Sequence, residues 1–316
     1  MPAIPRILIA AAAKSSGKTT LTVGLARALK DRGLTVRAFK KGPDYIDPLW
    51  HRLAAGRAGY NLDFNTQSPD EILRLLALKG SGADINIIET NKGLHDGIDL
   101  KGRDSNAALA RLTQSPVVLL IDTEGTTRGI APLLLGYQAF DPAVSIAGVI
   151  LNRVGGPRHE EKLRAAVETY TDIPVLGAVP RDPAMVLPER HLGLTTPGDM
   201  EAELSAHVDR IAQAVRGGVD LDRLLRIAAT APALEMALPP APPPPAPDVR
   251  VAIAQDAAFC FTYADDLEAF AAAGAELAPF SPIADERLPE NIDGLFLPGG
   301  FPETHMAELA ANESMR

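Results

Sequence analysis

The feature that most constrains this chain is an apolar run near its start that leads directly into a Gly-Lys-Thr turn. Residues 7–13 are all Ile, Leu or Ala and indicate a buried strand, and residues 21–30 carry apolar side chains at helical spacing. Between them lies Lys14-Ser15-Ser16-Gly17-Lys18-Thr19-Thr20. A strand, a loop and a helix in this order predict a phosphate-binding loop, because the loop N–H groups and the helix N-terminus attract anions.

The polar residues of this loop predict nucleotide binding. We expect residues 15–20 to surround the phosphates, with Lys18 reaching the β- and γ-phosphates and the Thr19 hydroxyl binding Mg²⁺. Ala12 stands where the standard G-x-x-x-x-G-K-[ST] pattern has its first glycine, and Lys14 adds positive charge near the phosphates. A chance Gly-Lys-Thr turn between a strand and a helix is the alternative.

Composition and charge limit the classes of protein to which the chain can belong. A length of 316 residues suggests about two domains, and 46% apolar residues are enough for sizeable cores. The net charge of −9 argues against nucleic acid as a partner, and the lack of any run of about 18 uncharged apolar residues argues against a membrane span. The first strand begins too early to leave room for a signal peptide, and the single cysteine, Cys260, rules out an intrachain disulfide. We therefore expect a cytoplasmic protein.

Strand and helix patterns alternate along the first two thirds of the chain. The further predicted strands are residues 35–39, 84–89, 115–122, 145–154 and 173–180. The predicted helices between them are residues 68–78, 106–112, 130–140 and 160–169, and residues 201–227 form one or two closing helices. Such alternation predicts an α/β fold with a mostly parallel, doubly wound sheet that is covered on both faces.

Three of these strands end in or lead into a carboxylate, and two of them carry the acids of the candidate site. Asp44 and Asp47 follow the second strand in a loop with glycine and proline, and Glu89 ends the third. Because doubly wound sheets bind ligands at the carboxyl ends of their strands, we expect these acids to bind metal or to orient substrate. A solvated turn with aspartate capping is the alternative for Asp44 and Asp47. Asp96, which precedes Gly97, is on its own more typical of a turn.

A proline-rich segment predicts a domain boundary. Seven prolines fall within residues 239–247, which are too many for a helix or a central strand. We therefore assign residues 1–237 to a first domain and residues 238–248 to an extended, semi-rigid linker.

A second α/β pattern follows this linker in residues 249–316. It has strands at 249–254 and 294–297 and a helix at 264–273. About seventy residues are short for a doubly wound domain, so we expect this second domain to be truncated.

The stretch Phe39-Lys40-Lys41-Gly42-Pro43-Asp44-Tyr45-Ile46-Asp47-Pro48 closely resembles the hallmark block of the cobyrinic acid a,c-diamide synthase family. Supporting blocks are Asn61-Leu62-Asp63, Gly93-Leu94-His95-Asp96-Gly97, Gly148-Val149-Ile150-Leu151-Asn152-Arg153-Val154 and Glu189-Arg190-His191-Leu192-Gly193-Leu194. The segment Pro298-Gly299-Gly300-Phe301-Pro302-Glu303 is similar to the glycine loop of class I glutaminases. The resemblance covers the whole chain and implies a ligase that uses ATP and glutamine to amidate the a and c acetates of a tetrapyrrole.

The resemblance also implies roles for individual residues. It implies that Lys18 and Thr19 bind ATP and Mg²⁺. It also implies that Asn152 occupies the position at which related dethiobiotin synthetases recognise the adenine. Metal or acyl-phosphate roles fall on Asp44, Asp47, Glu89 and Asp96, with Thr19, Asp44 and Glu89 as metal ligands. Tyr45 and Lys92 are the expected substrate contacts, and Gly300 is expected to contribute to the glutaminase oxyanion hole.

Two departures from the family pattern bear on substrate and chemistry. The usual Glu-Gly-Val-Met-Gly-Leu is replaced by Glu89-Thr90-Asn91-Lys92-Gly93-Leu94, and this polar variant makes sirohaem the alternative substrate. Cys260 lies upstream of the glycine loop, whereas the nucleophilic cysteine of the family lies beyond it. We therefore interpret Cys260 as a small buried hydrophobe and expect the nucleophile to be missing from this chain.

The expected reaction joins ATP chemistry to amide formation. A substrate carboxylate attacks the γ-phosphate, and ammonia, free or from glutamine, then displaces phosphate from the acyl phosphate. The alternatives are a dethiobiotin-synthetase-like ligase and a partitioning-type ATPase that dimerises with nucleotide. The linker and second domain argue against the first, and Ala13, where such ATPases carry lysine, argues against the second. The expected partners are the tetrapyrrole and the nitrogen donor, and a homodimer is left open.

Overall fold

The computed structural model describes residues 4–187, 199–234 and 245–315. The block at 189–194 and most of the linker predicted at 238–248 lie outside the described residues, and the linker stays a prediction.

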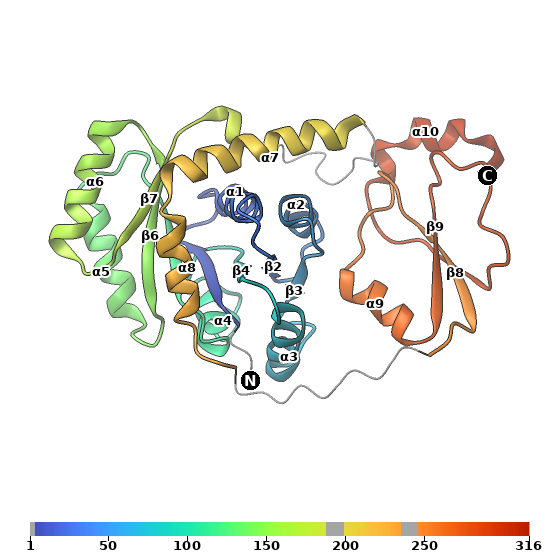
Figure 1. Cartoon of the computed structure of the whole chain (residues 1–316), viewed down its shortest axis with the longest axis horizontal. Helices are drawn as coiled ribbons and strands as arrows, with labels where there is room; N and C mark the ends of the chain where they lie inside the picture. Colours follow the sequence, from blue (N-terminus) through green and yellow to red (C-terminus); the bar gives the residue numbers. More distant parts are fainter. Residues whose placement is uncertain (1–3, 188–198, 235–244, 316) are drawn as a thin grey trace. The chain divides into compact units, whose positions relative to one another are not determined.

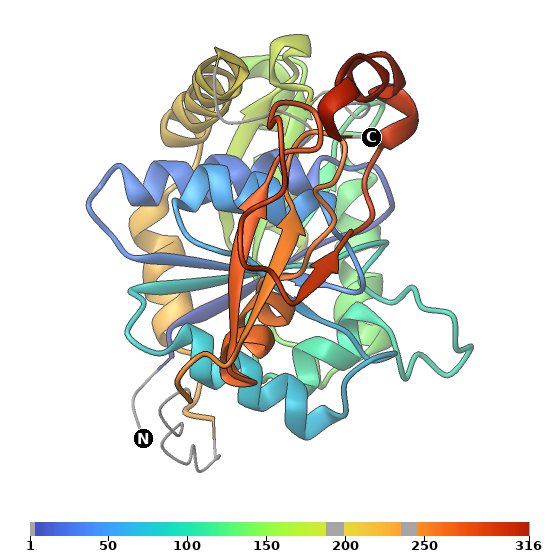
Figure 2. The ribbon, with the colours of Figure 1, turned by 90° about the vertical axis from the view of Figure 1, so that its right-hand side faces the viewer.

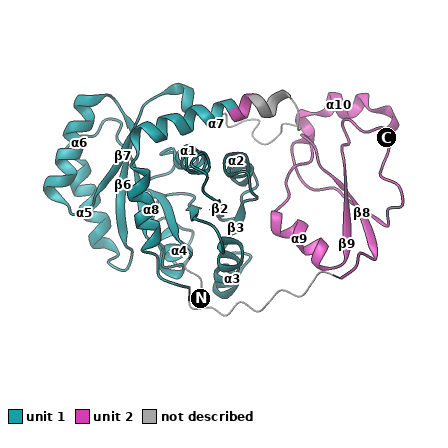
Figure 3. Cartoon of the chain, in the orientation of Figure 1, with its two compact units in different colours: residues 1–187, 206–238 teal, residues 188–205, 239–316 magenta. Residues whose placement is uncertain are grey.

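The chain divides into two compact units (Figure 3). The first contains residues 1–187 and 206–238, and the second contains residues 188–205 and 239–316. The first unit is therefore discontinuous in sequence, which the predicted division at 237 did not anticipate.

The first unit is built on a seven-stranded sheet in which neighbouring strands are parallel. Its strand order is β3-β2-β4-β1-β5-β6-β7. The strands are β1 Arg6–Ala11, β2 Val36–Lys41, β3 Tyr60–Leu62, β4 Ile85–Glu89, β5 Val117–Asp122, β6 Ile146–Val154 and β7 Val175–Pro180.

Helices cover this sheet on both faces. They are α1 Lys18–Lys30, α2 Ile46–Ala55, α3 Pro69–Gly80, α4 Asn106–Leu112, α5 Ile130–Phe140, α6 Pro157–Tyr170, α7 Asp199–Gly218 and α8 Leu221–Ala229. Helices α1 and α2 lie on one face, and α3 and α4 lie on the other (Figure 1). The predicted parallel, doubly wound α/β sheet is confirmed.

The register of the central strands brings the candidate site together. All six residues of β1 are buried, as expected for a strand covered on both faces. Ile9 of β1 pairs with Glu89 of β4, and Glu89 pairs on its other side with Lys40 of β2. The phosphate loop after β1 therefore lies at the carboxyl ends of the strands, close to Lys40 and Glu89.

The prediction of a loop through residues 44–48 is wrong, because α2 begins at Ile46. Pro48 suggested a turn, but a proline in the first helical turn removes no N–H that the helix needs. Asp44 Oδ1 accepts hydrogen bonds from the N–H groups of Ile46 and Asp47 at 2.9 and 3.0 Å. Asp44 thus has the capping role that was the alternative interpretation, whereas Asp47 lies within the helix.

A fully buried arginine joins the start of the sheet to the segment after α8. Arg6 opens β1, and its Nε donates a hydrogen bond to Thr113 O at 2.8 Å. Its Nη1 donates to Ile4 O at 3.0 Å and its Nη2 to Pro232 O at 2.8 Å. Desolvation lowers the pKa of Arg6 to about 10, and these carbonyl oxygens replace the lost water.

A close approach of two backbones joins α7 to the edge strand β7. Gly177 of β7 and Val219, directly after α7, form an antiparallel bridge. A Cβ atom on Gly218 would lie 2.1 Å from Ala178 O, whereas a Cβ atom on Gly217 would meet no atom within 4 Å. Residue 218 must therefore be glycine, and residue 217 has room for a side chain.

The second unit contains a three-stranded parallel sheet in the order β10-β8-β9 (Figure 2). The strands are β8 Val249–Ala254, β9 Ala275–Phe280 and β10 Gly294–Phe296, and the helices are α9 Ala264–Ala272 and α10 Met306–Ala311. Strand β9 was not predicted because Pro279 interrupts its pattern, but β9 is an edge strand, where a missing N–H is tolerated.

None of the helices in the described ranges is both long and apolar enough to cross a membrane.

The change Gly218→Ala is expected to lower the free energy of unfolding by about 2–3 kcal/mol, because the new Cβ would overlap a carbonyl oxygen of β7. The matched change Gly217→Ala should be neutral or should stabilise by up to about 1 kcal/mol, since alanine favours a helix over glycine. Chemical denaturation followed by circular dichroism measures both. Equal destabilisation by the two changes would contradict the close approach.

Candidate active site

The phosphate loop ends in a helix N-terminus that no side chain caps. Gly17 has a left-handed backbone with φ of 88°, and Ser15 has φ of 62°. The first turn of α1 contains no acidic residue, and Gly17 makes no capping bond. Lys18, the first helical residue, is 8% exposed. The N-terminal N–H groups of α1 are thus suited to an anion.

Three side chains from two other elements, α5 and β6, bind the carbonyl oxygens of this loop. The Tyr137 hydroxyl donates to Ala12 O at 2.7 Å, and Arg153 Nη2 donates to Ser15 O at 3.0 Å. Asn152 Nδ2 donates to Ser16 O at 2.8 Å, and a Cβ atom on Gly17 would lie 2.5 Å from the same nitrogen. Asn152 therefore lies against the phosphate loop, and adenine recognition by Asn152 stays a prediction.

A buried cluster around Glu89 lies beside the loop. Glu89 is fully buried, and its Oε1 accepts hydrogen bonds from the Thr19 hydroxyl at 2.7 Å and from Lys40 Nζ at 2.8 Å. Its Oε2 lies 2.6 Å from His51 Nε2. Asp47 Oδ2 lies 3.2 Å from the Thr19 hydroxyl and also accepts a hydrogen bond from Lys40. The structure therefore brings together three of the predicted residues, Thr19, Asp47 and Glu89.

Burial and mutual charge set the protonation of this cluster. Burial opposes ionisation of Glu89, but the charge of Lys40 and the hydrogen bond of His51 outweigh it, so the pKa of Glu89 lies well below its usual range. Burial also opposes the charge of Lys40, yet Glu89 and Asp47 raise its pKa. Burial, together with the charge of Glu89, raises the pKa of Asp47 to about 6. Glu89 and Lys40 are thus a charged pair.

The charges of the same cluster also affect the pKa of Lys18 in the phosphate loop. Burial lowers the pKa of Lys18 to about 8, while the negative charge of Glu89 partly offsets that effect. An incoming anion would add negative charge beside Lys18 and favour its ammonium form.

The oxygen atoms of the cluster fit a magnesium ion that takes its remaining ligands from phosphate. Thr19 Oγ1, Asp47 Oδ2 and Glu89 Oε1 converge, and Mg²⁺ prefers such oxygens together with substrate phosphates and water. Asp44, one of the predicted ligands, caps α2 with its Oδ1 and has its Oδ2 4.0 Å from Lys40 Nζ, and its metal role stays a prediction. Within the described residues, no group of three or more His, Cys, Asp or Glu side chains forms a metal cage by itself.

Lys40 and His51 are site residues that the sequence analysis missed. Lys40 stands in the hallmark block, where a lysine inside a buried strand was a signal for a buried ion pair. His51 follows Asp47 by four residues, so the two share one face of α2. In a loop at residues 44–48, positions 47 and 51 would share no face, so the sequence prediction gives this spacing no role.

The other predicted residues of the first unit lie around the cluster. Asp96 accepts a hydrogen bond from Gly93 N at 3.1 Å, which is a turn role, and its charge also acts on Lys18. Lys92 is exposed, and Tyr45 is half-buried at the start of α2. Their predicted roles toward substrate stay predictions.

The glycine loop of the second unit packs against the segment that contains Cys260. Phe261 N donates to Gly299 O, and Phe301 N donates to Ala258 O, both at 2.9 Å. A Cβ atom on Gly300 would lie 2.0 Å from Ala258 O, so this approach requires glycine. Cys260 is half-buried rather than buried, and burial, with the charge of Asp256, raises the pKa of its thiol to about 11. An oxyanion role for Gly300 stays a prediction.

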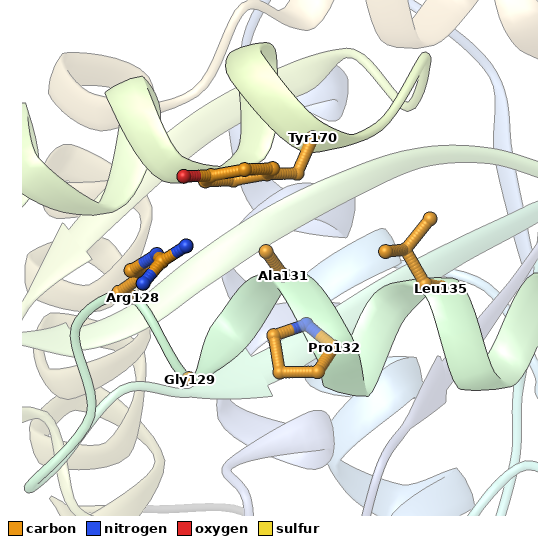
Figure 4. Close-up of a pocket in the computed structure, with 6 residues that line it drawn as sticks. All are labelled: Arg128, Gly129, Ala131, Pro132, Leu135 and Tyr170. Carbon is orange, nitrogen blue, oxygen red and sulfur yellow. The ribbon is translucent and has the colours of Figure 1, made fainter.

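A separate hollow of about 410 Å³ lies between the start of α5 and the end of α6 (Figure 4). Arg128, Gly129, Ala131, Pro132, Leu135 and Tyr170 line it. The Arg128 guanidinium lies 5.1 Å from the centre of the Tyr170 ring. None of the predicted site residues is among these six.

The change His51→Leu is expected to lower the free energy of unfolding by about 2–3 kcal/mol, because the buried Glu89 carboxylate loses a hydrogen-bond partner. His51→Gln retains a donor of similar reach and should lose less. In a Glu89→Gln background, His51→Leu should cost at least about 1 kcal/mol less. Denaturant titrations of this double-mutant cycle give the coupling, and additive effects would show that His51 acts only by packing.

Alkylation of Cys260 by iodoacetamide at pH 8 should be about 100-fold slower in the folded protein than in the unfolded chain. A thiol pKa raised from 9 to about 11 lowers the thiolate fraction by that factor. The rate should rise about tenfold per pH unit up to about pH 10. Mass spectrometry of the labelled protein measures it, and rapid labelling at pH 7 would point to an activated thiolate.

Two protein-family models match the chain. Residues 7–194 match the CobQ/CobB/MinD/ParA nucleotide binding domain, and residues 250–316 match the CobB/CobQ-like glutamine amidotransferase domain. Among solved structures, chloroplast FtsY from Physcomitrella patens aligns at 18% identity with a TM-score of 0.40, over 66% of this chain and 65% of its own.

Curated relatives match along nearly the whole chain. The cobyrinate a,c-diamide synthases of Magnetococcus marinus and Methanosarcina acetivorans are 46% and 44% identical over 98% and 99% of this chain, and over 68% and 65% of their own lengths. The hydrogenobyrinate a,c-diamide synthase of Mesorhizobium japonicum is 43% identical over 98% of this chain and 70% of its own length. The chain thus spans about two thirds of the length of these relatives, and it belongs to the cobyrinate a,c-diamide synthase family.

Proposed function

We propose that this chain is an ATP-dependent ligase that converts the a and c acetate carboxylates of cobyrinate into amides. The observation that carries the proposal is the convergence of Lys18, Thr19 and Lys40 with Asp47 and Glu89 at one edge of the sheet. The Lys18 ammonium beside an uncapped helix N-terminus is suited to the phosphates of ATP and to the charge that develops during phosphoryl transfer. The names of the relatives supply the macrocycle.

The first step makes a reactive acyl group. An acetate oxygen of the substrate bonds to the γ-phosphorus of ATP while the bond from that phosphorus to the β–γ bridging oxygen breaks, which gives an acyl phosphate and ADP. Lys18 and the N–H groups of α1 hold the phosphate oxygens and offset their charge. Lys40 holds Asp47 and Glu89 in place from the other side.

The metal and the loop supply the rest of the phosphate site. Thr19, Asp47 and Glu89 are the residues that would hold Mg²⁺, which when bound neutralises phosphate charge. Tyr137, Asn152 and Arg153 hold the loop carbonyls turned away from the phosphates, so that the N–H groups face them.

The second step forms the amide. Ammonia attacks the acyl carbon, phosphate leaves with the oxygen to which it was bound, and the nitrogen loses a proton. A free carboxylate does not undergo this reaction because its leaving group would be oxide. The match of residues 250–316 to a glutamine amidotransferase domain supports glutamine as the nitrogen source, with Gly300 in the oxyanion loop. Free ammonia is the alternative donor.

The decisive experiment measures macrocycle-dependent ATP hydrolysis and amide formation by mass spectrometry, with ammonium chloride as donor. Cobyrinate, hydrogenobyrinate and sirohaem are offered separately, because the polar Asn91 and Lys92 keep sirohaem as the second candidate. We expect two amidations of cobyrinate at the highest kcat/KM. ATP hydrolysis that no macrocycle accelerates would refute the proposal and favour a nucleotide-driven switch.

The change Lys18→Ala is expected to lower the amidation rate at least about 100-fold, because the γ-phosphoryl charge loses its nearest cation. Lys162→Ala, on the exposed surface of α6, is the matched control and should stay within about twofold of the wild type. Thermal unfolding of both variants checks that the fold is intact. Near-native turnover by Lys18→Ala would remove the phosphate-loop assignment.

A further inference from the structure

The loop between β4 and α4 exposes two aliphatic side chains to solvent. Ile98 is 82% exposed, and Leu100 is fully exposed. The loop of residues 93–104 to which they belong projects from the first unit (Figure 2). Exposed aliphatic side chains are common singly, whereas these two lie only two residues apart in one projecting loop.

Hydrogen bonds within the loop fix this conformation. The Asp104 carboxylate accepts bonds from Ile98 N at 2.7 Å and Asp99 N at 3.0 Å. The Asp99 carboxylate in turn accepts bonds from the backbone N–H and the side chain of Arg103 at 3.0–3.1 Å. The two aliphatic side chains are thus held outward by polar groups on either side, and the tip is pre-organised to meet a ligand.

Both stems of the loop are anchored at the active site. At the first stem Gly93 is buried, and a Cβ atom there would lie 2.8 Å from Ala12 O of the phosphate loop. At the second stem Asp104 O accepts a hydrogen bond at 2.7 Å from Nζ of Lys41, the neighbour of Lys40. The loop that carries Ile98 and Leu100 therefore begins beside the phosphate loop and ends beside Lys41.

We propose that Ile98 and Leu100 form a platform for one broad face of the macrocyclic substrate, which is the inference that rests on the proposed function. A tetrapyrrole has two broad faces of low polarity and carboxylates around its rim. The acids of this loop, Asp96, Asp99 and Asp104, all accept hydrogen bonds from N–H groups of the loop itself. The exposed ammonium groups of Lys92 and Lys101 match the rim carboxylates of the substrate. An apolar ring face with an anionic rim fits this arrangement better than a neutral apolar partner does.

The platform is tested with the full chain and the double variant Ile98→Ser/Leu100→Ser. The KM for cobyrinate should rise at least about tenfold, because two aliphatic contacts are lost. The kcat at saturation and the KM for ATP should stay within about twofold, since neither side chain touches the phosphate site. The melting temperature should not change, because both side chains are already in water.

The matched control is Leu135→Ser, an exposed leucine on α5, which should leave every constant unchanged. A second variant, Lys101→Ala, should raise the KM for cobyrinate, and its effect should shrink as salt concentration rises. Direct titration of the macrocycle by its visible absorbance, without ATP, separates binding from turnover.

Three results would overturn the platform. An unchanged KM for cobyrinate in the double variant removes it, and so does an equal rise in the KM for ATP. Loss of a wild-type dimer in sedimentation of the double variant would assign the tip to a contact between copies instead. Failure of the proposed function is a different result, because then the wild-type chain itself amidates no macrocycle.

Discussion

The rest of the first unit depends on one buried carboxylate, that of Glu89. A charge with no access to water is tolerated only when its partners replace the lost hydration, and here the partners come from different elements. Lys40 comes from β2, His51 from α2 and Thr19 from α1. The hydrogen bonds that compensate the buried charge of Glu89 therefore also fix the positions of the groups in the proposed nucleotide site. The same contacts thus serve both stability and function.

The connections between the strands explain why the site lies at the carboxyl ends of the central strands. The connection after β1 runs through α1 to one face, and the connection after β4 runs through α4 to the other (Figure 1). Loops that part in this way leave the strand ends open to a ligand, which is the general position of sites in doubly wound sheets. The phosphate loop lies on one side of this ligand position, and both ends of the loop of residues 93–104 lie on the other.

Most of the fold could be predicted because its strands are long apolar runs and its helices have clear amphipathic spacing. The exceptions have physical causes. β3 has only three residues, which is too short for a period to show, and Pro48 hid the start of α2. For the site, strand ends located Glu89 and the turn pattern located Lys18. Lys40 and His51 escaped because their roles depend on pairing with Glu89, 49 and 38 residues away, which spacing along the chain does not reveal.

The discontinuity of the first unit has a consequence for how this protein can be divided. β7 looks like the last strand of a finished domain, yet Gly177 pairs with Val219, and the guanidinium of Arg6 needs the carbonyl of Pro232. A fragment cut after β7 would remove the backbone bridge at Gly177 and one of the carbonyl acceptors of the buried Arg6 guanidinium. The segment after α7 thus completes the first unit, and a fragment meant to retain the nucleotide site should extend past α8 to include Pro232.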